Sequence, residues 1–295
     1  MRHVDLDGIK CLELSNGQLT LLAAVSVGPR ILSLRLGDGP NLFAILPKAT
    51  LDCPGVGVFH FYGGHRLWVA PEVPASTYLP DDNEVNVEAI DGGVRLVQAP
   101  HPGTSIQKTI ELRLAPSAPR VEIRHLLRNV GRDSRRLAPW AITQLVPGGV
   151  AILPHAATCA DESAVLPNRQ IAVWPYTDLG SDRIRWGNRA ILIEARMREG
   201  MLKLGYPNPS GWMGYWREGT LFVKKARLQA GAEYLDMGSS SECYCDPRFL
   251  ELETLGPATE LQAGESVVHS EIWAIHAGVQ WTEDLAEVYA AAAEG

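Results

Sequence analysis

Hydrophobic and polar residues alternate in short runs along most of the chain, with the period of a β-strand rather than that of a helix. The runs are rich in Val, Ile, Leu and Thr, and turn residues such as Asn16-Gly17 and Asp38-Gly39 separate them. Asp91-Gly92 predicts a hairpin turn. Strands are predicted over residues 19–27, 30–36, 93–98, 106–114, 120–127, 190–195, 220–226, 249–255 and 266–275.

A helix is indicated only near the C-terminus. Thr282 is predicted to cap it, Glu283 and Asp284 fall in its first turn, and an alanine-rich run over 285–293 follows. There is no βαβ alternation, no internal repeat and no low-complexity linker. The pattern therefore predicts an all-β fold, a single domain over residues 1–295 built as a large antiparallel β-sandwich with a short C-terminal helix.

Composition and charge narrow the possible partners. The net charge of −7 over 295 residues argues against nucleic acid. No apolar run approaches the roughly 20 residues that span a bilayer, and acids at the N-terminus do not fit a signal peptide. We therefore expect no membrane partner and a cytoplasmic location. The five scattered cysteines favour buried free thiols over a disulfide framework. The oligomeric state is not determined by the sequence.

The most informative segment is Phe249–Pro257. Its alternation places Leu250 and Leu252 on one face and Glu251 and Glu253 on the other. Two carboxylates on one strand face, with Cα atoms roughly 6.5 Å apart, suit general acid–base chemistry or the binding of a hard cation. The alternative is a solvent-facing strand with ordinary surface acids. Glu242 precedes this strand closely enough to share its site, or is a surface acid.

A second segment, residues 59–72, combines several groups that recognise polar ligands. Gly63-Gly64 allows close approach to the backbone, and His65 can exchange protons near neutral pH. Arg66 offers a fork of donors, while Tyr62 and Trp68 offer flat faces for a sugar ring. Glu72 follows a proline at its end. The alternative is that His65 and Trp68 pack in the core while Arg66 pairs with an acid.

Further candidates are less specific. Trp212 and Trp216 are equally consistent with core packing and with a stacking platform. Lys224 is a candidate ligand-binding residue, and the adjacent Lys225 points to the opposite face of the same strand. His155 follows a strand and could reach a cleft, although a structural histidine is the simpler interpretation.

Three segments together resemble the galactose mutarotase-like (aldose 1-epimerase-like) superfamily and, within it, the branch called DUF4380. The segments are Tyr62-Gly63-Gly64-His65-Arg66-Leu67-Trp68 with Pro71-Glu72, Leu137-Ala138-Pro139-Trp140-Ala141-Ile142-Thr143-Gln144 with Pro147-Gly148-Gly149, and Phe249–Pro257 followed by Leu261–Ser266 and Glu271-Ile272-Trp273. The third segment is the most specific, because a Leu-Glu-Thr strand, a proline and a Leu-x-x-Gly-Glu turn occur in that order.

The resemblance implies a β-supersandwich that binds carbohydrate in a shallow cleft. In aldose 1-epimerases a glutamate on a Leu-Glu-Thr-type strand is the base for the anomeric hydroxyl, and Glu253 matches it. Arg66 is a looser match to the substrate-binding arginine. The family's acid histidine lies in a mid-chain strand, whose equivalent here, residues 139–144, has no histidine. His65 or His155 would then have to supply the proton.

These observations predict a carbohydrate-active protein, an isomerase of aldose 1-epimerase type or an enzyme acting on a sugar or uronate by a related reaction. Its catalytic residues would be Glu253 and His65, and the residues expected to bind substrate are Arg66, Trp68, Glu72, Lys224, Glu242 and Glu251. The alternative is a binding or sensing protein without chemistry. No cofactor is expected, since no phosphate-cradling glycine loop is present. A calcium or zinc site on Glu242, Glu251 and Glu253 with a histidine ranks last.

Overall fold

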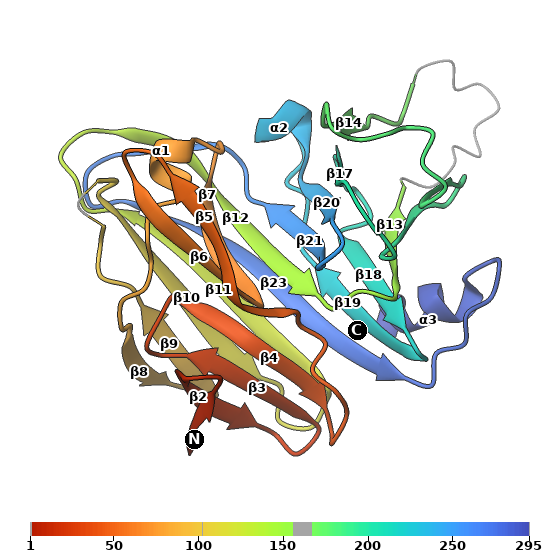
Figure 1. Ribbon diagram of the computed structural model, residues 1–295, viewed down its shortest axis with the longest axis horizontal. Coiled ribbons are helices and arrows are strands. Elements are labelled where there is room, and N and C mark those ends of the chain that lie inside the picture. Colours follow the sequence, from red (N-terminus) through yellow and green to blue (C-terminus); the bar gives the residue numbers. More distant parts are fainter. Residues whose placement is uncertain (1, 102, 156–166, 295) are drawn as a thin grey trace.

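The computed structural model describes residues 2–101, 103–155 and 167–294. Two large sheets form the layers of a sandwich (Figure 1). The 11-stranded sheet has the order β1 (Arg2–Leu6), β2 (Ile9–Ser15), β3 (Leu19–Ala24), β4 (Arg30–Leu36), β7 (His65–Ala70), β12 (Arg135–Leu145), β21 (Leu250–Leu255), β20 (Ser241–Cys245), β17 (Leu202–Tyr206) and β14 (Ala172–Val173), and β22 (Thr259–Leu261) pairs with the start of β12.

The second sheet has ten strands. Their order is β15 (Ile184–Trp186), β16 (Ala190–Glu194), β13 (Val150–Pro154), β18 (Trp212–Arg217), β19 (Thr220–Lys225), β23 (Ser266–Ala277), β11 (Arg120–Asn129), β10 (Ile106–Leu114), β9 (Gly93–Val97) and β8 (Asn86–Ile90). A separate hairpin joins β5 (Ile45–Cys53) to β6 (Gly57–Gly63). The helices are α1 (Pro74–Thr77), α2 (Leu235–Gly238) and α3 (Ala286–Glu294).

The prediction of an all-β antiparallel sandwich with a short C-terminal helix is confirmed. Strands β4 and β10 have the predicted bounds, and the other predicted strands differ by a few residues at their ends. Asp91-Gly92 forms the predicted two-residue turn, because Ile90 pairs with Gly93. The cap of α3 differs from the prediction. Asp284, rather than Thr282, accepts the backbone hydrogen bond from Ala286, at 3.1 Å.

The main hydrophobic core lies between the two large sheets. On β21 the core-facing residues are Leu250 and Leu252, as the alternation predicted. Leu202 and Leu204 of β17 contribute to the same core. Four cysteines, Cys11, Cys53, Cys243 and Cys245, are buried free thiols, and Cys159 lies outside the described residues. Within the described part of the chain, no helix has the length and apolar character needed to cross a membrane.

The two glycines at the junction of β6 and β7 are required by the fold itself. Gly63 and Gly64 have φ values of +89° and +71°. A Cβ atom on Gly63 would lie 2.0 Å from the carbonyl oxygen of Ala44, and one on Gly64 would lie 2.1 Å from that of Ile31. The close approach that this pair permits is therefore made by the chain's own backbone.

Candidate functional site

A cleft lies on the face of the 11-stranded sheet that points away from the main core. It encloses about 290 Å³, near the lower end of the range for small-molecule sites. Its lining residues come from β6, β7, β12, β17, β20 and β21 and from the loops beside them: Phe61, Arg66, Trp68, Glu72, Tyr78, Trp140, Ile142, Trp174, Tyr176, Met201, Lys203, Tyr244, Arg248, Phe249 and Glu251.

Strand alternation explains which side chains reach this cleft. On β7, Leu67 faces the main core, so Arg66 and Trp68 face the other way. On β21, Leu250 and Leu252 face the core, so Glu251 faces the cleft. Antiparallel pairing of β7 with β12 and of β12 with β21 then brings these side chains together across three strands.

Aromatic rings form much of the cleft wall. The ring centroids of Trp68 and Trp140 lie 5.3 Å apart, and those of Trp68 and Tyr78 lie 5.2 Å apart, both with edge-to-face geometry. Trp174 and Tyr176 also line the cleft. Aromatic walls with a few polar groups among them are typical of sites that bind sugar rings through their C–H faces.

Glu251 is held in place by two donors from neighbouring strands. Its Oε1 accepts hydrogen bonds from Gln144 Nε2 at 2.9 Å and from Arg66 Nη2 at 3.3 Å. The guanidinium of Arg66 also lies 4.1 Å from the ring centroid of Trp68. Burial and the negative charge of Glu253 raise the pKa of Glu251 to about 7, although Arg66 and Lys203 oppose the shift. A carboxyl group that titrates near neutral pH therefore faces the cleft.

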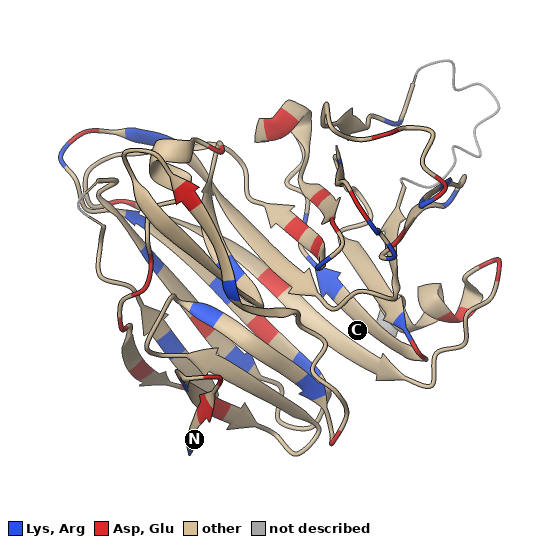
Figure 2. Ribbon diagram, viewed as in Figure 1, with Lys and Arg blue, Asp and Glu red and all other residues tan. Residues whose placement is uncertain are grey.

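Glu253 is fully buried and belongs to a charged cluster behind the cleft wall. Its Oε2 accepts hydrogen bonds from Trp140 Nε1 at 2.7 Å and from Lys203 Nζ at 2.9 Å, while Oε1 has no hydrogen-bond partner among the residues that the structure describes. Glu242 is paired with Glu253 across β20 and β21, and its carboxylate lies 2.7 Å from Lys203 Nζ. Figure 2 shows the acidic residues of these two neighbouring strands.

Lys203 is one of several cleft residues that no sequence pattern singled out, together with Trp174, Tyr176, Tyr244 and Arg248. Lys203 lies on β17, is 5% exposed and lines the cleft. Burial alone would lower the pKa of Lys203, but Glu242 and Glu253 more than offset this effect and hold its pKa well above the ordinary value. The sequence did contain one sign of it. Lys203 lies between Leu202 and Leu204 in one strand, so alternation turns it to the face of the sheet away from these two core leucines.

The structure does not bring His65 into the cleft. It lies on the other face of β7 from Arg66, is fully buried between the two large sheets, and is absent from the cleft lining. Burial holds its pKa well below the ordinary value. The physical reason is strand alternation, since adjacent residues of one strand cannot both face the same side.

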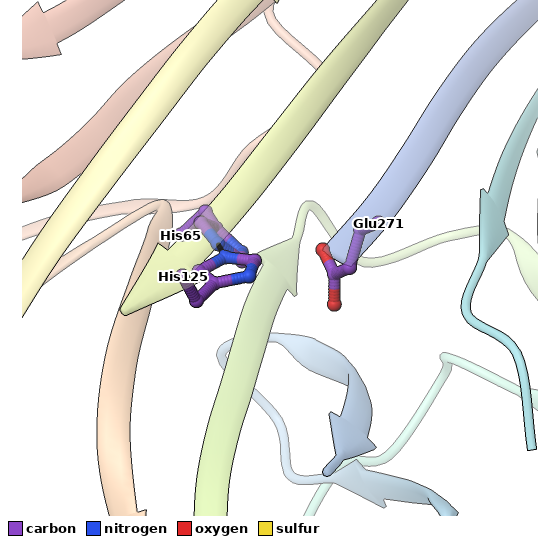
Figure 3. A group of neighbouring side chains, drawn as sticks. All are labelled: His65, His125 and Glu271. Carbon is purple, nitrogen blue, oxygen red and sulfur yellow. Dashed lines mark hydrogen bonds between the residues drawn. The ribbon is translucent and has the colours of Figure 1, made fainter. Parts of the chain in front are cut away.

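The hydrogen bonds of His65 are consistent with a neutral ring. His125 Nδ1 lies 3.1 Å from the carbonyl oxygen of His269, so it must donate, and its Nε2 is then left to accept. His65 Nε2, at 2.7 Å, donates to it, and His65 Nδ1 accepts from the Thr143 hydroxyl at 2.9 Å. Figure 3 shows the two rings side by side, with Glu271 across from them.

Lys224 also lies between the sheets rather than in the cleft. Its Nζ donates to Thr143 Oγ1 and to the carbonyl oxygens of Ala141 and Leu252, each at 3.0 Å, and lies 3.0 Å from Glu271 Oε1. It is fully buried. The expectation that Lys224 contacts a ligand in the cleft therefore finds no support in its position.

The described residues contain one group with metal-ligand geometry, His65, His125 and Glu271, whose ligand atoms lie within 4.8 Å of one another. Their polar atoms already have partners, because the two rings bond each other and Lys224 neutralises Glu271. The carboxylates of the predicted cation site, Glu242, Glu251 and Glu253, also have positively charged protein groups beside them. The ammonium of Lys203 lies between Glu242 and Glu253, where a cation would bind.

Of the remaining candidates, Glu72 lines the cleft, and His155, Trp212 and Trp216 do not. Glu72 lines the cleft and accepts a hydrogen bond from the Tyr78 hydroxyl. His155 is outside the lining, and its ring lies 6.5 Å from that of Tyr206. Trp212 and Trp216 lie on β18, where they pack against the C-terminal segment that contains Trp281 and Tyr289. Core packing, one of their two interpretations, is the one their position supports.

Comparison with solved structures shows which fold this is. A galactose mutarotase-like protein from Lactobacillus casei has a TM-score of 0.58 at 12% identity, covering 90% of this chain and 100% of the other. A candidate aldose 1-epimerase from Escherichia coli K12 has a TM-score of 0.57 at 13% identity, covering 92% and 100%. The fold is galactose mutarotase-like. No protein-family model and no curated protein matches the sequence.

Proposed function

We propose that this protein acts on a sugar in the cleft by aldose 1-epimerase-like chemistry, interconverting anomers or catalysing a related reaction on a sugar or uronate. The observation that carries the proposal is the position of β21. This strand presents two carboxylates, Glu251 and Glu253, to the side of the sheet where Trp68 and Trp140 form an aromatic wall.

Glu253 is the proposed base, on the strength of its match to the family's Leu-Glu-Thr strand. Its Oε1 has no partner among the described residues. Because Glu253 is buried behind the cleft wall, an anomeric hydroxyl would have to enter that wall beside Trp140 and Lys203 to donate to this oxygen. Arg66, Trp68, Glu72 and Glu251 are proposed to hold the hydroxyls and the ring face. Glu242 is proposed to act behind them through its contact with Lys203. The DUF4380-type branch is retained as part of this proposal.

One observation favours the alternative of a binding or sensing protein without chemistry. Among the described residues that line the cleft there is no histidine, although the family's acid is one. The cleft-facing positions of β12 are Trp140 and Ile142. Catalysis therefore requires a proton donor of a different type.

Anomer exchange measured by NMR for a panel of aldoses and uronic acids tests the proposal. Catalysed exchange for at least one sugar, reduced in Glu253→Gln, is the expected result. Saturable binding of a sugar without exchange at any pH would instead establish the alternative. Neither exchange nor binding for the whole panel would contradict both.

A further inference from the structure

The ammonium of Lys203 has more donors than the protein uses. Nζ lies 2.7 Å from Oε2 of Glu242 and 2.9 Å from Oε2 of Glu253. Nζ donates a hydrogen bond to Glu253, and its contact with Glu242 is an ion pair. An ammonium carries three N–H donors, so at least one remains even when each carboxylate takes one. Its other close contacts within the described chain are the ring faces of Trp140 and Trp174, each 4.7 Å from Nζ. Lys203 lines the cleft, where a bound ligand could accept the remaining hydrogen.

The position of this ammonium is fixed before any ligand binds. Two carboxylates from β20 and β21 hold Nζ, and two indole rings enclose it. Donors that are already oriented cost no reorganisation when charge develops on a substrate atom. A buried lysine held in this way can serve a reaction at one point of the cleft.

The contact between Lys203 and Glu253 decides which group could be the acid, because Glu253 is the proposed base. In a cyclic sugar, the anomeric hydroxyl oxygen and the ring oxygen are bonded to the same carbon, C1. An acid for the ring oxygen must therefore lie beside the base for the anomeric hydroxyl. Lys203 Nζ lies 2.9 Å from the Glu253 carboxylate, whereas His65 lies on the far side of the sheet.

We propose that Lys203 is the general acid of this cleft and takes the place of the histidine that the mutarotase pattern lacks here. The assignment rests on the proposed function. As the C1–O5 bond breaks, its electron pair goes to O5, which takes a proton from Nζ. The electron pair of the anomeric O–H bond forms the C1=O bond, and Glu253 takes that proton. After rotation about C1–C2, both transfers reverse, so Lys203 and Glu253 return to their starting states.

Several charged or titratable groups face Lys203. Glu242, Glu253 and Glu251 come from β20 and β21, Asp236 lies in α2, and Tyr176 lies in the loop after β14. The two nearest carboxylates keep the amine protonated through the neutral range. The acid should therefore remain loaded at pH values at which an ordinary histidine has lost its proton.

The test compares anomer exchange in wild type, Lys203→Ala and Lys203→Arg, with the exposed Lys10→Ala as the matched control. We expect Lys203→Ala to lose about 10²–10⁴ of the catalysed rate, the usual worth of one general acid, while Lys10→Ala keeps it. Ethylamine should restore part of the lost rate in proportion to its protonated concentration. A folded Lys203→Ala that retains full exchange, or that ethylamine leaves unchanged, would overturn the assignment.

If Lys203→Ala does not fold, the rate–pH profile of active proteins decides. The exchange rate is measured against pH in wild type and in Glu251→Gln. As the pH rises to about 8, we expect the rate of neither protein to fall. Such a loss, present in both proteins, would assign the acid to a group that titrates near neutrality, not to Lys203. If wild type exchanges no sugar, the proposed function fails and this assignment fails with it. If Lys203→Ala exchanges as well as wild type, only this assignment fails.

Discussion

Arg66 and Glu251 are 185 residues apart in the sequence and meet in the cleft, where Arg66 Nη2 lies 3.3 Å from Glu251 Oε1. Gln144 donates to the same oxygen at 2.9 Å. Both donors therefore converge on one oxygen of the carboxyl group. This arrangement orients the carboxyl group of Glu251 in the cleft wall.

The raised pKa of Glu251 predicts a pH-dependent contribution to stability. Its pKa is about 7 in the folded protein and about 4.5 as an unperturbed group, so the folded state binds the proton more tightly. Between these pH values the unfolded chain releases the proton first, and the free energy of unfolding falls as pH rises. Relative to Glu251→Gln, wild type should lose about 3 kcal/mol between pH 4.5 and 7.5.

Urea unfolding across this pH range, with the exposed Glu260→Gln as control, measures the difference. Comparison with Glu251→Gln is needed because buried histidines act in the opposite direction. Burial lowers the pKa of His269 to about 3, so its contribution is lost as pH falls below about 6.5. Parallel curves for wild type and Glu251→Gln would show that Glu251 titrates normally.

Glu253→Gln tests the base. The substitution keeps the shape of the side chain and one acceptor oxygen, so we expect sugar affinity to change little. Anomer exchange should fall by about 10²–10⁴, because the amide cannot take the anomeric proton. Exchange spectroscopy and calorimetry on the same samples separate the two effects. Unchanged exchange would remove Glu253 from the mechanism.

Lys224→Met tests the structural role of a lysine that lies outside the cleft. Removing its ammonium leaves Glu271 buried without its ion-pair partner, which should cost about 3–5 kcal/mol of unfolding free energy. The double variant Lys224→Met/Glu271→Gln should recover part of this loss. Sugar affinity of the folded protein should stay unchanged. A tenfold loss of affinity in folded Lys224→Met would instead give Lys224 a role in binding.

The aromatic wall can be tested with a pair of tryptophans. Trp68 lines the cleft, whereas Trp216 packs against Trp281 beside the C-terminal helix. A stacking contact is worth about 0.5–1.5 kcal/mol, so Trp68→Ala should weaken sugar binding up to about tenfold. Trp216→Ala should lower the melting temperature without this loss. Equal affinities for both variants would show that the sugar does not use the Trp68 face.

Much of the fold could be predicted from the sequence, because strand alternation and turn residues are local signals. The bounds of β4 and β10, the Asp91-Gly92 hairpin and the two-sided character of β21 all follow from residues adjacent in the chain. Residue types also indicated the polar and aromatic segment around Arg66 and Trp68, both of which line the cleft.

The sequence by itself determined which residues share a strand face, and only the tertiary structure decided where each face points. His65 and Arg66 alternate, but both faces of β7 are buried, so local polarity could not tell the interior from the cleft. Lys203 belongs to the site only because β17 pairs with β20, and β20 with β21. Lys203 and Glu253 are 50 residues apart and meet only through these two pairings, which depend on packing of the whole sheet and which no local pattern encodes.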